Sequence, residues 1–269
     1  MKALENYMIA GFGSARIYRT DGIFNLRDYG GYWVAGVGRV RTGMLFRSGE
    51  LSRVSDADLA LLEGLGLKTV IDLRSAGERA AAPSRRAADF AGKIVFSEDY
   101  VHARPPHALA AHGAVDAEAV RGRFLRAFAA MPFQSKMIDV FRLYLEALAA
   151  EQGATLVHCS AGKDRSGIAV ALLHACLGVH ADDIRADFLL TNEAGAMSNR
   201  YADLAASIRA SLGEGAPEEA VLAGLRVEPE FLDVMFAAIE DAGGLTAYLH
   251  NTLMLTSDVR DRLRANLIC

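Results

Sequence analysis

Residues 158–167 read His158-Cys159-Ser160-Ala161-Gly162-Lys163-Asp164-Arg165-Ser166-Gly167 and lie between two apolar segments. Residues 154–157 predict a short buried strand. Residues 168–177 predict a buried helix, because all of them except His174 are apolar or small. A strand that runs into a helix leaves free backbone N–H groups at the positive end of the helix dipole. Such a place binds anions, phosphate above all, so the stretch predicts an α/β fold with an anion site at the end of a strand.

The residue types inside this stretch indicate the chemistry of the anion site. Arg165 would close a ring of amides around a phosphate with two parallel hydrogen bonds, a geometry that lysine cannot supply. The sulfur of Cys159 would lie at the base of the ring, where positive potential favours a thiolate, and a thiolate aimed at phosphorus is a nucleophile. The expected phosphate-binding residues are Ser160, Ala161, Gly162, Lys163, Asp164 and Arg165.

The stretch resembles the phosphate-binding loop of the cysteine-dependent tyrosine phosphatase superfamily, in the form His-Cys-x-Ala-Gly-Lys-Asp-Arg-Ser/Thr-Gly that is typical of a bacterial branch. Further segments resemble this branch in the correct order, at 24–31 (Phe-Asn-Leu-Arg-Asp-Tyr-Gly-Gly), 47–51 (Arg-Ser-Gly-Glu-Leu), 72–78 (Asp-Leu-Arg-Ser-Ala-Gly-Glu) and 187–192 (Asp-Phe-Leu-Leu-Thr-Asn). The resemblance spans about residues 20 to 268.

The resemblance implies a single tyrosine phosphatase-like catalytic domain over residues 1–269, with a central, mostly parallel sheet flanked by helices. The sequence pattern agrees, because strand-like segments cluster before residue 160 and helical patterns dominate the C-terminal half. Helices that follow the loop cover the active site in some relatives. We therefore expect a helical lid within residues 193–226.

The resemblance also assigns roles in hydrolysis. Cys159 would attack phosphorus and form a thiophosphate, which water then hydrolyses, while Arg165 holds the charge on the oxygens. The hydroxyl of Ser166 would stabilise the departing thiolate, although a serine at a helix start is equally often a cap. His158 would order the loop through hydrogen bonds to the backbone.

Two aspartates are candidates for the proton donor to the leaving group. Many superfamily members use the aspartate of a Trp-Pro-Asp motif, which is absent, because the single tryptophan, Trp33, is followed by Val34. Asp164 matches the position that the branch is thought to use as general acid. Asp72 is the second candidate, and the alternative for Asp72 is a structural pairing with Arg74 or Arg47.

The substrate implied by the resemblance is a phosphorylated protein, through phosphotyrosine and also phosphoserine or phosphothreonine, or a phosphoinositide, with inorganic phosphate as product. Lys163 at the loop rim would add a charge near a second phosphate, which favours phosphoinositides. Small phosphorylated metabolites such as inositol phosphates and a phosphate-binding non-enzyme stay open as alternatives. The six-residue spacing from Cys159 to Arg165 disfavours a rhodanese-like sulfurtransferase. A thiol-based arsenate reductase is disfavoured because no second cysteine lies close in sequence as an obvious resolving thiol, with Cys176 as the one to test.

Composition excludes several other classes. A net charge of −4 implies no general attraction to nucleic acid or to an anionic membrane. No apolar stretch reaches the length of a membrane span and no signal peptide is evident, so we expect a cytoplasmic protein, with export by another signal left open. Neither metal nor cofactor is expected, since the spacing of His102, His107 and His112 matches no helical ligand pair.

Overall fold

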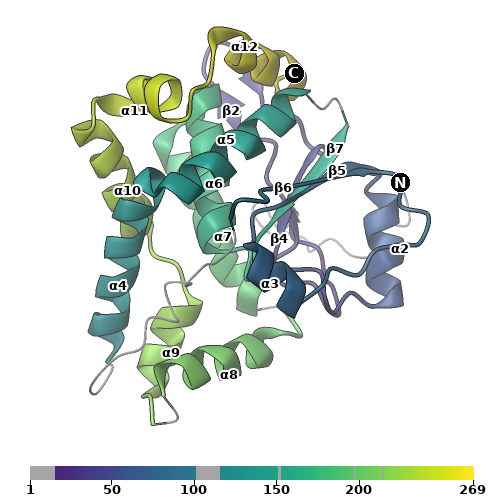
Figure 1. The fold of residues 1–269 in the computed structure, drawn as a ribbon, viewed down its shortest axis with the longest axis vertical. Helices are drawn as coiled ribbons and strands as arrows, with labels where there is room; N and C mark the ends of the chain where they lie inside the picture. Colours follow the sequence, from purple (N-terminus) through teal and green to yellow (C-terminus); the bar gives the residue numbers. More distant parts are fainter. Residues whose placement is uncertain (1–15, 101–115, 151–152, 197, 214) are drawn as a thin grey trace.

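The computed structural model describes residues 16–100, 116–150, 153–196, 198–213 and 215–269 of the chain (Figure 1). Five strands form one sheet in the order β1-β4-β7-β5-β6. Four of these strands run parallel and β1 pairs antiparallel with β4. Their bounds are Arg27–Asp28 (β1), Leu45–Ser48 (β4), Leu67–Asp72 (β5), Lys93–Phe96 (β6) and Ala154–His158 (β7). The predicted mostly parallel α/β sheet is confirmed.

β7 is the central strand, and all five of its residues are buried. A parallel strand that is covered on both faces is expected to be a nearly continuous apolar run, and Ala-Thr-Leu-Val fits this description. Neighbouring side chains of β7 point to opposite faces of the sheet. Leu156 packs in the smaller core on one face, and Val157 packs in the larger core on the other. The strand therefore ends at His158 in the middle of a rigid sheet.

Helices cover both faces of the sheet. α2 (Asp56–Gly64) lies on the side of the smaller core, whereas α5 (Ser135–Ala150) and α6 (Asp164–Leu177) lie on the other side (Figure 1). Ser55 caps α2 and forms a capping box with Asp58, as the serine before the apolar pattern predicts.

The C-terminal half is helical, as expected, apart from short connections. Its helices after α6 are α7 (Ala181–Ala196), α8 (Tyr201–Leu212), α9 (Glu218–Leu225), α10 (Pro229–Asp241), α11 (Gly244–Ala247), the π-helical turn η4 (Tyr248–Thr252) and α12 (Ser257–Leu267). The remaining elements of the fold are the β2–β3 ribbon (Trp33–Val34 and Gly38–Arg39), α3 (Ala76–Ala81), α4 (Ala117–Ala130) and the 3₁₀ turn η3 (Met131–Phe133). Among the described residues, no helix combines the length and apolar character that crossing a membrane requires.

Two buried tyrosines connect the segment after β1 to α5. Tyr29 and Tyr144 are both inaccessible to solvent, and their hydroxyl oxygens lie 2.9 Å apart. Removing one hydroxyl leaves the other buried without this partner, which costs more than removing both.

We therefore expect Tyr144→Phe to lower the free energy of unfolding by about 1–3 kcal/mol, because the Tyr29 hydroxyl is then unpaired. The double variant Tyr29→Phe/Tyr144→Phe should recover part of this loss, as measured by urea unfolding at pH 7. Strictly additive losses in the double variant would show that the two hydroxyls are not coupled.

Candidate active site

Residues 158–167, the loop that we expect to bind phosphate and call the phosphate loop, begin where three parallel strands end side by side. His158 of β7 is in register with Ser48 of β4 on one side and with Asp72 of β5 on the other. The chain then turns through residues 159–163 and enters α6 at Asp164. The predicted order of strand, loop and helix is confirmed, and the loop lies at the carboxyl end of the central strand, where ligands of open α/β sheets bind.

Cys159 lies in the turn directly after β7 and is 2% exposed. Neighbouring backbone amides fix the loop on both sides of it. The amide of Leu73 donates to the carbonyl of His158 at 2.8 Å, and the amide of Glu50 donates to the carbonyl of Ser160 at 2.9 Å. Both donors follow strands of the sheet, so the rigid sheet sets the position of the sulfur.

Arg165 is held in place by a carboxylate that the sequence analysis did not assign to the site. Its two terminal nitrogens donate to the two oxygens of Glu78 at 2.7 and 2.6 Å. Ser160 Oγ also donates to Glu78 Oε1, at 2.6 Å. A bidentate pair of this kind fixes the plane of the guanidinium as well as its position.

Glu78 is presented to Arg165 by the first turn of α3. Ser75 caps this helix, and Ser75 and Glu78 form a capping box. Burial alone would raise the pKa of Glu78, but the Arg165 guanidinium and the Ser160 hydroxyl lower it to about 2. The sequence signal was present, since Ser75-x-x-Glu78 is a capping box that ends one of the family-like segments. The contact of Glu78 with Arg165 is seen only in the structure.

Asp164 and Ser166 occupy the first turn of α6 next to the loop. The side chain of Asp164 is 10% exposed, and its Oδ1 lies 3.4 Å from Lys163 Nζ. Ser166 is fully buried, and its hydroxyl makes no hydrogen bond within the described part of the chain. The hydroxyl of Ser166 therefore does not cap the helix, and it stays available for a group bound in the loop.

Lys163 does not extend into solvent at the loop rim. Its ammonium donates to the carbonyl of Gly224 at 2.8 Å and lies 3.9 Å from the centre of the Phe124 ring. Burial lowers the pKa of Lys163, and the carboxylate of Asp164 opposes this shift. Because Gly224 belongs to α9, Lys163 connects the phosphate loop to the segment in which a lid was expected.

Asp72 and His158 lie on the sheet side of the loop. Both oxygens of Asp72 accept from Arg74, at 2.9 Å from Nε and 2.7 Å from Nη2. Burial would raise the pKa of Asp72, but His158 and Arg74 lower it. The imidazole of His158 is buried, which lowers its pKa, and its Nδ1 lies 3.4 Å from the carbonyl of Cys159. Asp72 thus has Arg74 as its structural partner, one of the two alternatives considered for it.

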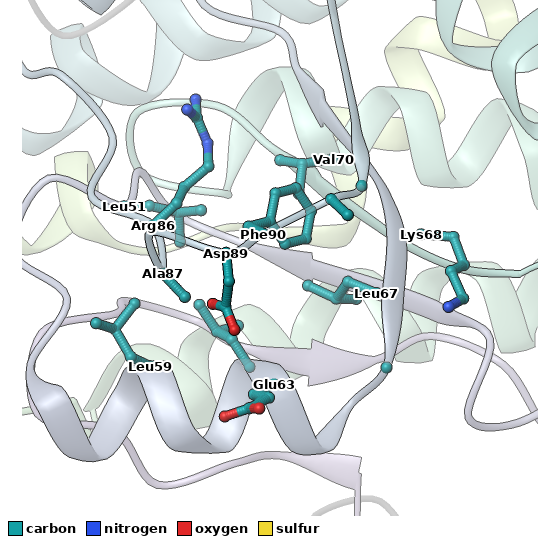
Figure 2. Close-up of a pocket in the computed structure, with 14 residues that line it drawn as sticks. Leu51, Leu59, Glu63, Leu67, Lys68, Val70, Arg86, Ala87, Asp89 and Phe90 are labelled. Atoms are coloured by element: carbon teal, nitrogen blue, oxygen red, sulfur yellow. The ribbon is translucent and has the colours of Figure 1, made fainter.

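A separate pocket of about 290 Å³ lies between α2, β5 and residues 86–92 (Figure 2). Its walls are mainly apolar, with Leu59, Leu67 and Phe90, and include the charged residues Glu63 and Lys68. No residue of the phosphate loop lines it, so this pocket is not the anion site.

Metal ligands are not gathered at the site. Within the described ranges, no group of three or more His, Cys, Asp or Glu side chains is arranged to hold a metal ion. The three histidines of the 99–116 loop, His102, His107 and His112, lie outside the described residues.

Comparison with known proteins agrees with this geometry. The model of a tyrosine phosphatase family matches residues 18–269. A Cupriavidus necator protein named as a candidate tyrosine-protein phosphatase is 35% identical over 244 residues, which cover 87% of this chain and 82% of that protein. The triple specificity protein phosphatase PtpB of Mycobacterium tuberculosis is 31% identical over 191 residues, or 64% of this chain and 68% of that protein. A tyrosine-protein phosphatase of Nostoc commune is 33% identical over 141 residues, or 51% of this chain and 45% of that protein.

The ion pair between Glu78 and Arg165 predicts a pH-dependent loss of stability. Because the pKa of Glu78 falls from about 4.5 to about 2 in the folded state, its contribution is present above pH 4.5 and disappears as the pH falls toward 2. We expect Glu78→Gln to lower the free energy of unfolding by about 2 kcal/mol at pH 7, and by much less near pH 2.

Urea unfolding from pH 7 to pH 2 measures this difference. Glu63→Gln, at an exposed position of α2, is the matched control and should follow the wild type throughout. A gap between wild type and Glu78→Gln that stays constant across this range would contradict the assigned role of the pair.

Proposed function

We propose that this chain, which belongs to the tyrosine phosphatase family and is a phosphatase, hydrolyses phosphate monoesters through a covalent intermediate on Cys159. The observation that carries the proposal is the arrangement of one buried cysteine, the first turn of α6 and an arginine whose plane is fixed by Glu78. Such an arrangement supplies a nucleophile and a preorganised anion site together.

In the first step, the Cys159 thiolate attacks phosphorus and forms the P–S bond while the bond from phosphorus to the leaving oxygen breaks. The leaving oxygen takes the electron pair of that bond and a proton from Asp164. Loop amides and the Arg165 guanidinium hold the charge on the three equatorial oxygens.

In the second step, water attacks phosphorus and gives a proton to Asp164 while the P–S bond breaks. The departing thiolate takes the electron pair of the P–S bond and accepts a hydrogen bond from the Ser166 hydroxyl. Inorganic phosphate then leaves. The Ser166 hydroxyl is buried and has no hydrogen-bond partner in the described part of the chain, which supports this role, because an unpaired buried donor is costly unless another state of the site uses it.

Asp164 is the better general acid of the two aspartates. Asp72 has both oxygens engaged by Arg74, and its Oδ2 also lies 3.6 Å from His158 Nε2. Among the described residues the Asp164 carboxylate has an ion pair to Lys163 alone, and its side chain keeps some exposure. A partly exposed carboxyl at the first turn of α6 can reach a leaving oxygen and exchange its proton with water.

We propose phosphotyrosine in proteins as the main substrate, with phosphoserine, phosphothreonine and phosphoinositides as further substrates. The names of the relatives support protein substrates. The placement of Lys163 supports the same preference, because an ammonium bound to the Gly224 carbonyl is not free to bind a second phosphate. Inositol phosphates and other small metabolites rank below phosphotyrosine, because the names of the relatives support protein substrates.

The segment 193–226 is proposed to act as a movable lid within a single catalytic domain. It carries α8 and α9, which lie at the lower end of the view in Figure 1. Polar contacts join it to the rest of the chain. Lys163 donates to the carbonyls of Gly224 and Arg226, Arg200 pairs with Glu50 at 2.6 Å and donates to the Gly22 carbonyl, and Asp203 pairs with Arg53 at 2.5 Å. Ile208, Val221 and Leu225 of the segment also pack in the larger core, so the proposed movement is a local opening in which the polar contacts break and reform.

The chemical proposal is tested by phosphate release from a phosphotyrosine peptide with EDTA present. Cys159→Ser should abolish turnover. Asp164→Asn should lower the rate about 10²-fold or more with this poor leaving group and far less with an activated aryl phosphate, because only the former needs a proton. If Asp72→Asn shows this dependence on the leaving group and Asp164→Asn does not, the assignment of the acid is wrong.

The lid is tested by hydrogen exchange in the apo protein. Lys163→Met removes the ammonium that holds α9, so amides within 218–226 should exchange about tenfold faster. Lys68→Met, an exposed lysine of β5, is the matched control and should leave these amides unchanged. Equal protection of this segment in wild type and Lys163→Met would contradict the role of Lys163 in holding α9.

A further inference from the structure

We propose that Asn25 and Arg47 are positioning residues of the phosphate loop, which act by holding the carbonyl of Gly162 and thereby turning the amide of Lys163 toward the bound phosphoryl group. The inference deepens the proposed function and rests on it. Both residues lie in family-like segments of the sequence, where Arg47 was considered only as a structural partner of Asp72.

The Gly162 carbonyl accepts two side-chain hydrogen bonds. Asn25 Nδ2 donates to it at 2.9 Å and Arg47 Nη2 donates at 3.0 Å. Both side chains are buried, with Asn25 2% exposed and Arg47 inaccessible. Two donors from separate segments that meet on one carbonyl fix the direction of that peptide group more tightly than a single donor would.

The direction of this carbonyl decides the direction of the next amide. The peptide bond is planar and trans, so the N–H of Lys163 points opposite to the C=O of Gly162. Asn25 and Arg47 lie outside the turn of the loop, and the amide is therefore aimed into the turn, where the phosphoryl oxygens would lie. The carbonyls of His158 and Ser160 are held in the same way by the amides of Leu73 and Glu50.

The backbone on both sides of the contact has unusual conformations that fit this role. Gly162 has φ +64°, and a Cβ at this position would lie 2.3 Å from the backbone of Ser48. Asn25 has φ +61°, in the left-handed region that few residues other than glycine adopt. Rare conformations of this kind concentrate at functional sites, where the surrounding structure holds them.

A buried network keeps the two donors in place. Arg47 Nη1 donates to Asp187 Oδ2 of α7 at 3.1 Å. Arg27 donates to the side-chain oxygen of Asn25 and, at 2.9 Å, to the backbone carbonyl of Asp187. Because Asn25 Oδ1 is occupied by Arg27, its amide nitrogen must face Gly162. Two arginines share one carboxylate, which leaves positive charge beneath the anion site.

The test uses inorganic phosphate as the probe and the full chain in the Cys159→Ser background. Asn25→Gly removes the donor and keeps the left-handed backbone accessible, and Arg47→Lys keeps the charge but cannot reach Asp187 and Gly162 together. We expect each variant to bind phosphate about tenfold more weakly in calorimetry, and the double variant to bind more weakly still.

The decisive readout is the Lys163 amide resonance in ¹⁵N-resolved NMR. In the parent protein, phosphate should move this proton downfield, as expected for an amide that donates to an anion. In Asn25→Gly/Arg47→Lys the movement should be lost, while that of the Ala161 amide, oriented through Glu50, is kept. Tyr144→Phe, which destabilises the fold without touching the loop, controls for stability and should bind phosphate normally.

Two results would overturn the inference. If both single variants and the double variant bind phosphate as tightly as the parent, with the Lys163 shift intact, the contacts serve stability alone. If the parent itself neither binds phosphate nor, with Cys159 restored, releases it from a phosphopeptide, the proposed function fails and the inference fails with it. Hydrolysis by wild type separates these two cases.

Discussion

The structure depends on a conflict within the phosphate loop. Amides that are to receive a phosphate must point into an open turn, and they are then unavailable to pair with the rest of the chain. The carbonyls of the same peptides must find partners outside, because buried polar groups without hydrogen bonds are costly. The ends of β4 and β5, the family-like segment at 24–31 and Glu50 supply those partners. The parallel sheet thus sets the position of the strand end and also the orientation of the loop.

Buried arginine–carboxylate pairs hold the surroundings of the loop. Arg165 pairs with Glu78, Arg74 pairs with Asp72, and Arg47 shares Asp187 with Arg27. Desolvation of such pairs consumes much of their Coulombic energy, so stability alone does not explain them. Their geometry is more informative, because the planar guanidinium fixes direction as well as distance. Glu78 sets the plane of Arg165, and Asp187 holds Arg47 against the loop.

The sequence predicted those parts of the site whose signals are local. Residues 154–177 show a buried strand, a glycine-containing turn and an apolar helix in continuous order, and these three elements form as expected. Glu78 was missed because its partner Arg165 is 87 residues away, and a capping box explains the serine and glutamate without it. The sequence predicted Lys163 at the rim of the phosphate loop because its partner is likewise distant in the sequence. Its acceptor is a backbone carbonyl of α9, 61 residues away, and a carbonyl leaves no trace in residue type.

The position of the Lys163 ammonium also links the proposed general acid, Asp164, to α9. The ammonium lies between the Asp164 carboxylate and the carbonyl of Gly224, so one cation contacts both the proposed acid and the proposed lid. Any movement of α9 that frees this ammonium alters the charge around Asp164, because an ion pair inside a protein is stronger than the same pair in water. If α9 moves away, the ammonium loses the Gly224 carbonyl and keeps the Asp164 carboxylate as its neighbour, because Lys163 belongs to the loop and not to α9. Opening of the proposed lid would therefore change the surroundings of the proposed acid through this one ammonium.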